Sequence, residues 1–307
     1  MGSRKLAVIY DKAGMHAYAE RARTCATWLQ YLAMGDGRKE LLGANFCQLR
    51  LCPMCVGRRA RRAAYKLSQV LDLTEKDHEV RFIFLTLTIQ NCWGKHLSET
   101  ITQLLRGWNL LIRHRKVERA IRGWFRALEI TRNEKDGTYH PHLHAILAVE
   151  PAYFKWASGL YITHDEWVDR WAKALRVDYR PSVNVKITKS KDPSVIQASA
   201  KSAKEAAKYC VKDEDFISPK LTMRQSVFIV KTYTNALRRR RLTAYGGWLL
   251  EAARLVGAED LDNGDLVHVD EERLRPDVAE LIEDYHWNLG VGDYILTSRR
   301  PNNNKSQ

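Results

Sequence analysis

Residues 140–147 read His-Pro-His-Leu-His-Ala-Ile-Leu, and the alternation of imidazole and apolar side chains in this stretch is typical of a β-strand with one polar face. Side chains two residues apart on a strand point to the same face. His142 and His144 are therefore expected to project side by side, while Leu143 enters the core. His140 shares the polar face by the same spacing. The stretch predicts both a strand and a pair of adjacent imidazole groups.

This strand needs an antiparallel partner, and residues 123–131 supply one that is rich in aromatic and β-branched side chains. Asp136 and Gly137, between the two, suit the positive φ angles of a hairpin turn. Further strands are predicted at 81–89 and 183–188, and helices at 15–35, 57–73, 97–118, 165–176, 194–212 and 223–241. This order predicts an α+β fold with an antiparallel sheet and flanking helices, and not a doubly wound parallel sheet.

Two neighbouring imidazole groups on one sheet face can chelate a divalent cation when each presents an unprotonated nitrogen. A third ligand is expected from the partner strand, where Glu129 lies. Two imidazoles and one carboxylate would leave coordination positions open for phosphate oxygens, as a metal that acts as a Lewis acid requires. Either His140 or Glu134 could replace one of the three ligands. The alternative for the whole group is a polar outer face without a metal.

The cysteines include a compact group, Cys47-x4-Cys52-Pro-Met-Cys55, whose spacing indicates a metal site before a disulfide. Cys25 is the expected fourth ligand, since four thiolates suit a closed, tetrahedral zinc site. His16 could take the place of Cys25. Free buried cysteines are one alternative. A redox use of Cys52 and Cys55 is another, although no thioredoxin-like sequence surrounds them.

The chain of 307 residues carries a formal net charge of +14, and this charge is unevenly distributed. Residues 257–293 hold twelve acidic and two basic side chains, so most of the positive charge falls before residue 257. Such a surplus favours a polyanionic partner, most often nucleic acid, over a solvated surface that serves solubility alone. The residues expected to contact DNA are Arg58, Arg59, Arg61 and Arg62 on the predicted helix 57–73, and Arg238, Arg239, Arg240 and Arg241.

Composition also excludes some classes of protein. A hydrophobic fraction of 45% excludes a chain that is disordered throughout. No apolar run approaches the roughly 18 residues needed to cross a bilayer, and the basic N-terminus lacks the apolar core of a signal peptide. We therefore expect a cytoplasmic protein that has no membrane partner.

A second chemical pattern lies in residues 203–212. There Glu205 and Tyr209 are four residues apart and share one face of the predicted helix, and Lys212 follows Tyr209 by three. A phenol is a poor nucleophile unless a cation stabilises its anion or polarises its target. A neighbouring carboxylate could activate water for a second displacement, and a lysine could hold a phosphate.

Three ordered motifs resemble those of the HUH endonucleases, and specifically those of the rolling-circle replication initiators (Rep proteins) of small bacterial plasmids. The motifs are the strand Phe84-Leu-Thr86-Leu-Thr88, the pair His142-Leu-His144, and Tyr209-x2-Lys212. The resemblance extends over about residues 20–240. It implies an HUH palm of RRM-like type, in which Thr86 and Thr88 are structural and carry little chemistry.

The resemblance also implies an activity. Tyr209 would attack the scissile phosphate of single-stranded plasmid origin DNA and become 5′-phosphotyrosyl-linked, leaving a 3′-OH that primes replication. The three metal ligands would bind Mn²⁺ or Mg²⁺. Glu205 would direct water at the phosphate in the terminating step, and Lys212 would position DNA. A host helicase is the expected protein partner.

Three parts of the chain are predicted on this basis. Residues 1–76 would form an N-terminal helical subdomain with the zinc knuckle, 77–220 the HUH catalytic domain, and 221–307 a C-terminal helical extension with the acidic tract and a frayed tail. Two other functions stay open at this point. One is a relaxase or single-strand transposase with the same constellation, and the other is a non-catalytic zinc-containing DNA-binding regulator.

Overall fold

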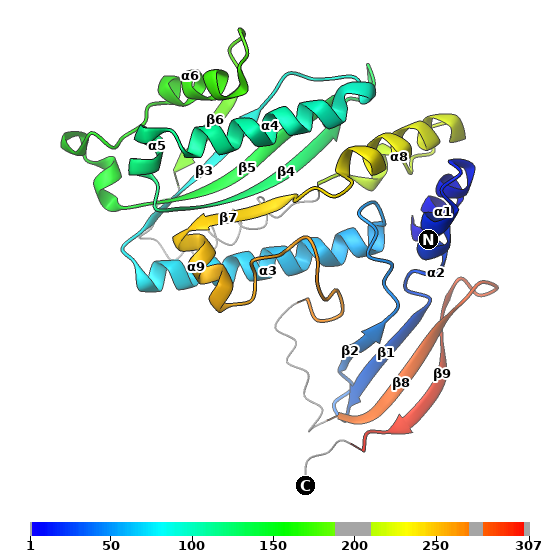
Figure 1. Cartoon of the computed structure of the whole chain (residues 1–307). Coiled ribbons are helices and arrows are strands. Elements are labelled where there is room, and N and C mark those ends of the chain that lie inside the picture. The colour runs from blue at the N-terminus through cyan, green and yellow to red at the C-terminus, as the bar shows by residue number, and fades with distance from the viewer. Residues whose placement is uncertain (1, 188–209, 270–278, 304–307) are drawn as a thin grey trace.

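The computed structural model describes residues 2–187, 210–269 and 279–303, which form two antiparallel sheets with most of the helices around the larger one (Figure 1). The α-helices are α1 (Gly2–Lys12), α2 (His16–Thr24), α3 (Pro53–Asp77), α4 (Leu97–Ile112), α5 (Arg115–Ala120), α6 (His164–Leu175), α8 (Met223–Leu237) and α9 (Trp248–Leu255). Short 3-10 helices are η1 (Gly94–His96), η2 (Pro151–Phe154), η3 (Trp156–Ser158) and η4 (Asp213–Asp215). No helix in the described part of the chain is both long and apolar enough to span a membrane.

The larger sheet has the strand order β6-β3-β5-β4-β7, and all its neighbouring strands are antiparallel. Its strands are β3 (Arg81–Thr88), β4 (Gly123–Arg132), β5 (Tyr139–Val149), β6 (Val183–Ile187) and β7 (Thr243–Gly247). The strand of histidines is β5, the central one, and the predicted hairpin with residues 123–131 is the β4–β5 pair. The predicted α+β class with an antiparallel sheet is confirmed.

Both faces of this sheet are buried along part of its length. Leu143 and Leu147 of β5 belong to an apolar cluster with α4, α6 and α8, whereas Ile146 and Ala148 belong to a second cluster with α3 and α9. His144, His142 and His140 continue the second face beyond Ile146, because side chains alternate along a strand. The histidines therefore lie where the apolar cover of α3 and α9 gives way to polar side chains.

The smaller sheet was not predicted. Its order is β2-β1-β8-β9, with strands β1 (Trp28–Met34), β2 (Lys39–Ala44), β8 (Ala279–Asn288) and β9 (Asp293–Pro301). The predicted helix over 15–35 ends at Thr24, and the C-terminal extension is not wholly helical, because residues 279–301 form a hairpin. The β1 stretch Trp-Leu-Gln-Tyr-Leu has strand-favouring side chains, but its partner β8 is about 250 residues away. Pairing at that distance leaves no local signal in the sequence.

A buried carboxylate, that of Glu283, connects three strands of this sheet. Glu283 of β8 is 2% exposed and accepts from Lys39 Nζ at 2.8 Å, from Arg299 Nη2 at 2.6 Å and from Tyr285 Oη at 2.8 Å. The hydrogen bond from Lys39 is the largest cause that lowers the pKa of Glu283 to about 2, against burial, which raises it. Glu283 thus joins side chains from β2, β8 and β9.

We predict that Glu283→Ala lowers the free energy of unfolding by on the order of 1–3 kcal/mol at pH 7, because two cations lose a buried acceptor. Urea titration monitored by tryptophan fluorescence measures this. Since the folded-state pKa is lowered, the contribution of Glu283 is complete above about pH 4.5 and disappears as the pH falls toward 2. The exposed Glu280, on the same strand, provides the control Glu280→Ala. Equal losses in the two variants would contradict the role of Glu283.

Candidate metal centres and their surroundings

The larger sheet brings the predicted ligands Glu129, His142 and His144 together on one face. Glu129 on β4 lies directly opposite His142 on β5, and His144 follows two residues along the same face. The Oε2 atom of Glu129 lies 2.8 Å from His144 Nε2 and 3.4 Å from His142 Nε2. These side chains are only 11% or 12% exposed. The arrangement gathers two nitrogen donors and one oxygen donor in a small, mostly sheltered volume.

The other ring nitrogens of the two histidines are also engaged. His142 Nδ1 lies 3.1 Å from the carbonyl oxygen of His140, which can only accept, so Nδ1 carries the proton. His144 Nδ1 lies 3.3 Å from the hydroxyl of Thr86 on β3. Nε2 is the ring atom that faces Glu129 in both residues. The outer contacts therefore orient both rings so that Nε2, the atom that a metal would bind, points toward the carboxylate.

Glu129 is charged in this environment. Burial raises the pKa of Glu129, but the hydrogen bonds from His142 and His144 outweigh it and hold the pKa well below its usual range. One carboxylate oxygen with two imidazole nitrogens is a donor set that Mn²⁺ and Mg²⁺ can accept. The three residues fit such an ion.

Neither alternative ligand joins this group. The ring of His140 stacks on that of His142 with 5.2 Å between centroids, and burial, then the charge of His142, lower the pKa of His140. Glu134 is 73% exposed in the hairpin loop, 3.5 Å from Lys220. Among the described residues, the donor atoms within 4.8 Å of one another at this site come from Glu129, His142 and His144 alone.

The four predicted cysteines also come together. Cys25, Cys47, Cys52 and Cys55 are all buried and lie where α2, the loop after β2 and the start of α3 meet. Their closest Sγ–Sγ distances are 3.5–3.6 Å. Four sulfurs at about 2.3 Å from a tetrahedral zinc would be about 3.8 Å apart, close to these distances. Hydrogen bonds from the Cys25 thiol first, and from the other two, hold the pKa of Cys55 far below its usual range. His16 lies on the surface, 79% exposed, beside Asp11.

Two of the predicted catalytic residues, Tyr209 and Glu205, lie outside the described residues. Cys210, which follows Tyr209 in the sequence, accepts a hydrogen bond through its carbonyl oxygen from the Ile130 backbone nitrogen at 2.8 Å. Ile130 is next to Glu129 on β4. Burial first, then the charges of Asp262 and Glu129 among others, raise the pKa of the Cys210 thiol. Cys210 therefore lies beside the strand that carries Glu129.

Lys212 is exposed and lies near the cysteine group. It borders a cavity of about 390 Å³ together with Leu51 and Pro53, which flank Cys52, and with Val211. The structure therefore places the segment that follows residue 209 between β4 and the start of α3. This contact links the cysteine group to the neighbourhood of the histidines.

The arginines of α3 that were predicted to contact DNA bond to the chain itself. Arg58, Arg59 and Arg62 all donate to backbone carbonyl oxygens within residues 260–267, for example Arg59 Nε to Asp262 O at 2.9 Å. Arg61 is exposed on the same helix. The first part of the acidic stretch 257–293 therefore covers the basic helix α3, and its backbone carbonyl groups make the contacts.

The second arginine group, Arg238 to Arg241, also contains both bonded and exposed members. Arg240 donates to the Ser98 carbonyl at 2.7 Å and to the Thr102 hydroxyl at 2.9 Å, both on α4. Arg238, Arg239 and Arg241 are exposed.

One site residue was undervalued in the sequence. Thr86 was expected to be structural, yet its hydroxyl contacts His144 Nδ1. The signal was present in the pattern: Thr86 and Thr88 alternate on β3 as His144 and His142 do on β5, and the register pairs them across the two strands.

The fold and the site define an α+β protein with one buried four-cysteine group and one two-histidine, one-carboxylate group. A family model described as a replication protein (Rep_1) matches residues 38–295 of the chain. The chain is 36% identical over 299 residues to a protein named "Protein rep" of Streptococcus pneumoniae serotype 2, covering 97% of this chain and 90% of that protein.

Two further relatives have the same kind of name. "Protein rep" of Bacillus amyloliquefaciens is 34% identical over 291 residues, with 91% of this chain and 84% of that protein covered. "Replication protein" of Staphylococcus aureus is 33% identical over 222 residues, with 71% and 92% covered. No solved structure matches the chain. The chain belongs to the Rep_1 family of plasmid replication proteins, which are generally nicking enzymes.

We predict that Thr86→Val weakens Mn²⁺ binding by about 10- to 100-fold, because His144 loses the contact that orients its ring. Isothermal titration with MnCl2 measures the affinity. Thr88→Val is the matched control, since Thr88 lies on the same strand but donates to the Ser182 carbonyl at 2.9 Å. Equal Mn²⁺ affinities in the two variants would show that Thr86 does not support the site.

Proposed function

We propose that this protein initiates rolling-circle replication by nicking one strand of a plasmid origin at a single-stranded site, with Tyr209 as the nucleophile. The observation that carries the proposal is the convergence of Glu129, His142 and His144 beside the stretch of β4 that Cys210 borders. Cys210 directly follows Tyr209, so a tyrosine is one residue away from a chain segment that lies against the strand of the metal ligand. A nucleophile and a metal site must be neighbours for this chemistry.

The reaction is a transfer of a phosphodiester. The phenol oxygen of Tyr209 attacks the scissile phosphorus while the bond from phosphorus to the 3′ oxygen breaks. The DNA then ends in a free 3′-OH, and its 5′ phosphate is esterified to the tyrosine. A divalent ion held by Glu129, His142 and His144 would supply Lewis-acid stabilisation of the phosphate oxygens. Thr86 and the His140 carbonyl keep the two rings oriented for that task.

Glu205 would act in the second half of the cycle. A carboxylate four residues before Tyr209, one turn away on the helix that the sequence predicts, could activate water against the second phosphate, which would end replication by hydrolysis. Lys212, which is exposed, would hold a phosphate or the DNA strand. Glu205→Ala is expected to form the covalent adduct as before but to release terminated product on the order of 100-fold more slowly. Parallel loss of nicking and termination in a two-site oligonucleotide assay would count against this role.

We also propose that the four-cysteine group binds zinc as a structural ion. Cys52→Ser is expected to reduce the zinc content well below one ion per chain and to lower the midpoint of thermal unfolding, because the buried thiolates lose their shared cation. Elemental analysis by mass spectrometry gives the ratio. Cys92→Ser, at a half-buried cysteine outside the group, is the control. An unchanged one-to-one ratio in Cys52→Ser would contradict the zinc site.

The partner of the reaction is origin DNA, and a host helicase is proposed to unwind the plasmid after the nick. Exposed arginines on the described surface, Arg61, Arg238, Arg239 and Arg241, are proposed DNA contacts. The match over residues 38–295 favours replication over the relaxase and transposase alternatives. A regulator without catalysis would not need the histidine and glutamate donors.

The test is covalent capture on a single-stranded origin oligonucleotide with Mn²⁺. The wild-type protein is expected to form a protein–DNA adduct, and mass spectrometry of the tryptic peptide ending at Lys212 should place the DNA on Tyr209. Tyr209→Phe should abolish the adduct, whereas the control Tyr161→Phe should retain it. An adduct that persists in Tyr209→Phe would move the nucleophile to another residue.

A further inference from the structure

The groove between α4 and α6 carries arginines that the proposed reaction does not use. It has a volume of about 880 Å³ and is bordered by Arg106 of α4, by Arg113 directly after α4 and by Arg176 directly after α6. All three side chains are exposed, and none forms a hydrogen bond or ion pair with another residue in the described ranges of the chain. The arginines of α3, by contrast, are bonded to main-chain carbonyls, as with Arg59 and Asp262.

The two walls of the groove are held at a fixed spacing. Gln103 of α4 donates to the Leu175 carbonyl at 2.9 Å, and Gly107 allows α6 to approach, since a Cβ there would lie 3.0 Å from a methyl group of Leu175. Arg113, the C-cap of α4, follows Arg106 by seven residues, which is two turns or about 10.5 Å along the helix axis. Arg176 stands on the opposite wall with a left-handed backbone, φ 58°. The cations therefore belong to both sides of a formed groove.

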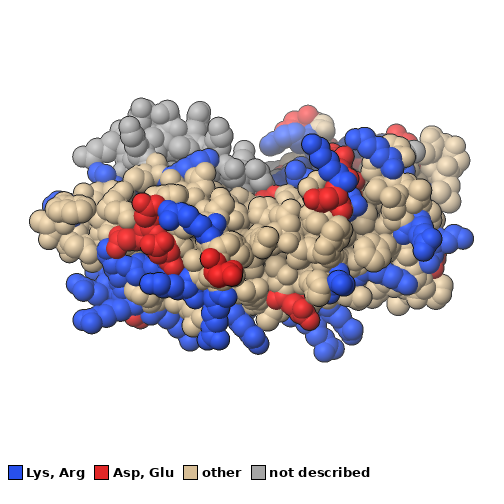
Figure 2. Space-filling view, turned by 90° about the horizontal axis from the view of Figure 1, so that it is seen from above, with Lys and Arg blue, Asp and Glu red and all other residues tan. Residues whose placement is uncertain are grey.

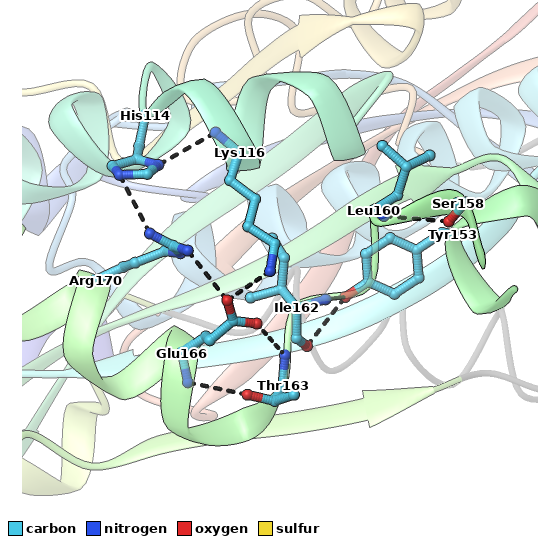
Figure 3. Close-up of polar contacts among 9 residues, drawn as sticks. All are labelled: His114, Lys116, Tyr153, Ser158, Leu160, Ile162, Thr163, Glu166 and Arg170. Carbon is cyan, nitrogen blue, oxygen red and sulfur yellow. Dashed lines mark hydrogen bonds and ion pairs between the residues drawn. The ribbon is translucent and has the colours of Figure 1, made fainter. Parts of the chain in front are cut away.

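The neighbouring helix α5 is fixed in the same way. Glu166 of α6 accepts from Lys116 at 2.5 Å and from Arg170 at 3.2 Å, and Arg170 lies 3.2 Å from His114 Nε2 (Figure 3). In this network the cations that lie between α5 and α6, Lys116 and Arg170, are paired with Glu166. Arg115 and Arg119 stay exposed beyond it. Seen from the side that carries α4, α5 and α6, Lys and Arg side chains gather along the lower edge of the molecule (Figure 2).

The character of the lining indicates the ligand. The groove has one carboxylate, Glu99, which lies 3.5 Å from His96 Nδ1. Its lining includes no Phe, Tyr or Trp on which unpaired bases could stack. Amide and hydroxyl groups, such as those of Gln103 and Asn109, stand beside the arginines. Guanidinium groups with polar neighbours and without aromatic platforms are suited to phosphates in a regular backbone.

We propose that this groove binds the phosphate backbone of duplex DNA. Each strand of a duplex carries one charge about every 3.4 Å along the duplex axis. The distance of about 10.5 Å between Arg106 and Arg113 therefore corresponds to about three such phosphate spacings when α4 lies along that axis. The groove lies over the sheet face opposite to Glu129 and the histidines, since α4 and α6 cover the other apolar cluster. The inference rests on the proposed function, in which an initiator meets its nick site within a duplex plasmid. The flanking duplex would be held on the back of the sheet that acts on the single strand.

The test measures binding of the full chain to a fluorescent 20-base-pair duplex of arbitrary sequence between 50 and 200 mM salt. Arg106→Gln/Arg113→Gln is expected to weaken binding at least fivefold at low salt. It should also reduce the slope of log affinity against log salt by about 2, one for each lost phosphate contact. Lys76→Gln/Arg254→Gln removes the same charge from exposed positions on α3 and α9 and should change both quantities little.

Arg176→Gly separates binding from folding. Glycine suits the left-handed backbone at this position, so the unfolding midpoint should stay equal or rise while duplex affinity falls. Unchanged duplex affinity in the groove variants, or equal losses in the control pair, would overturn the inference; the former is also the result expected if an acidic protein is the true partner. Adduct formation by the wild-type protein on a single-stranded oligonucleotide, measured alongside, tests the proposed function independently.

Discussion

The antiparallel register of β4 against β5 is the constraint on which the histidine site depends. Glu129 stands opposite His142 because Leu128 and Leu143, one residue earlier on β4 and one later on β5, face each other in the buried apolar layer. A slip of one residue would turn the carboxylate into that apolar layer and leave the imidazoles without a partner. The hairpin turn opposes such a slip: Gly137 has a φ of 75° and donates to the Asn133 carbonyl at 2.9 Å. The geometry of the candidate metal site is thus set by packing on the opposite side of the sheet.

The distribution of charge is governed by the main chain as well as by side chains. Arginines on α3 lie under a segment rich in acidic residues, yet Arg58, Arg59 and Arg62 donate to carbonyl oxygens of its backbone. A guanidinium group has five N–H donors and is satisfied by neutral acceptors as readily as by anions. Acidic side chains of that segment accept other hydrogen bonds. Asp262, for instance, accepts from the Leu242 nitrogen at 2.6 Å and from the Thr243 hydroxyl at 3.0 Å.

The sequence predicted those parts of the site whose geometry is local. Two residues on a strand, or three cysteines within nine positions, carry their spatial relation in their spacing, and the pairs His142/His144 and Cys52/Cys55 follow it. Glu129 was also predicted, because a tight hairpin leaves few possible registers. The sequence could not indicate that α3 arginines would be occupied by carbonyls, since every segment offers carbonyls equally. Nor could it indicate the pairing of β1 with β8, which depends on contacts between distant ends of the chain. Tyr209 and Glu205, which lie outside the described residues, stay predictions.

The smaller sheet has a consequence for synthesis. β1 leaves the ribosome early, but one of its two hydrogen-bonding edges is covered only by β8, which begins at Ala279. Until then that edge presents unpaired amide and carbonyl groups in a hydrophobic strand, the kind of edge to which other chains add. The sheet with the histidines has all its strands by Gly247, about thirty residues sooner. During synthesis, the strands of the larger sheet, with the β4–β5 pair, are therefore complete before β8 can cover the free edge of β1. A truncated chain that ended before β8 would have the larger sheet but an uncovered edge on β1.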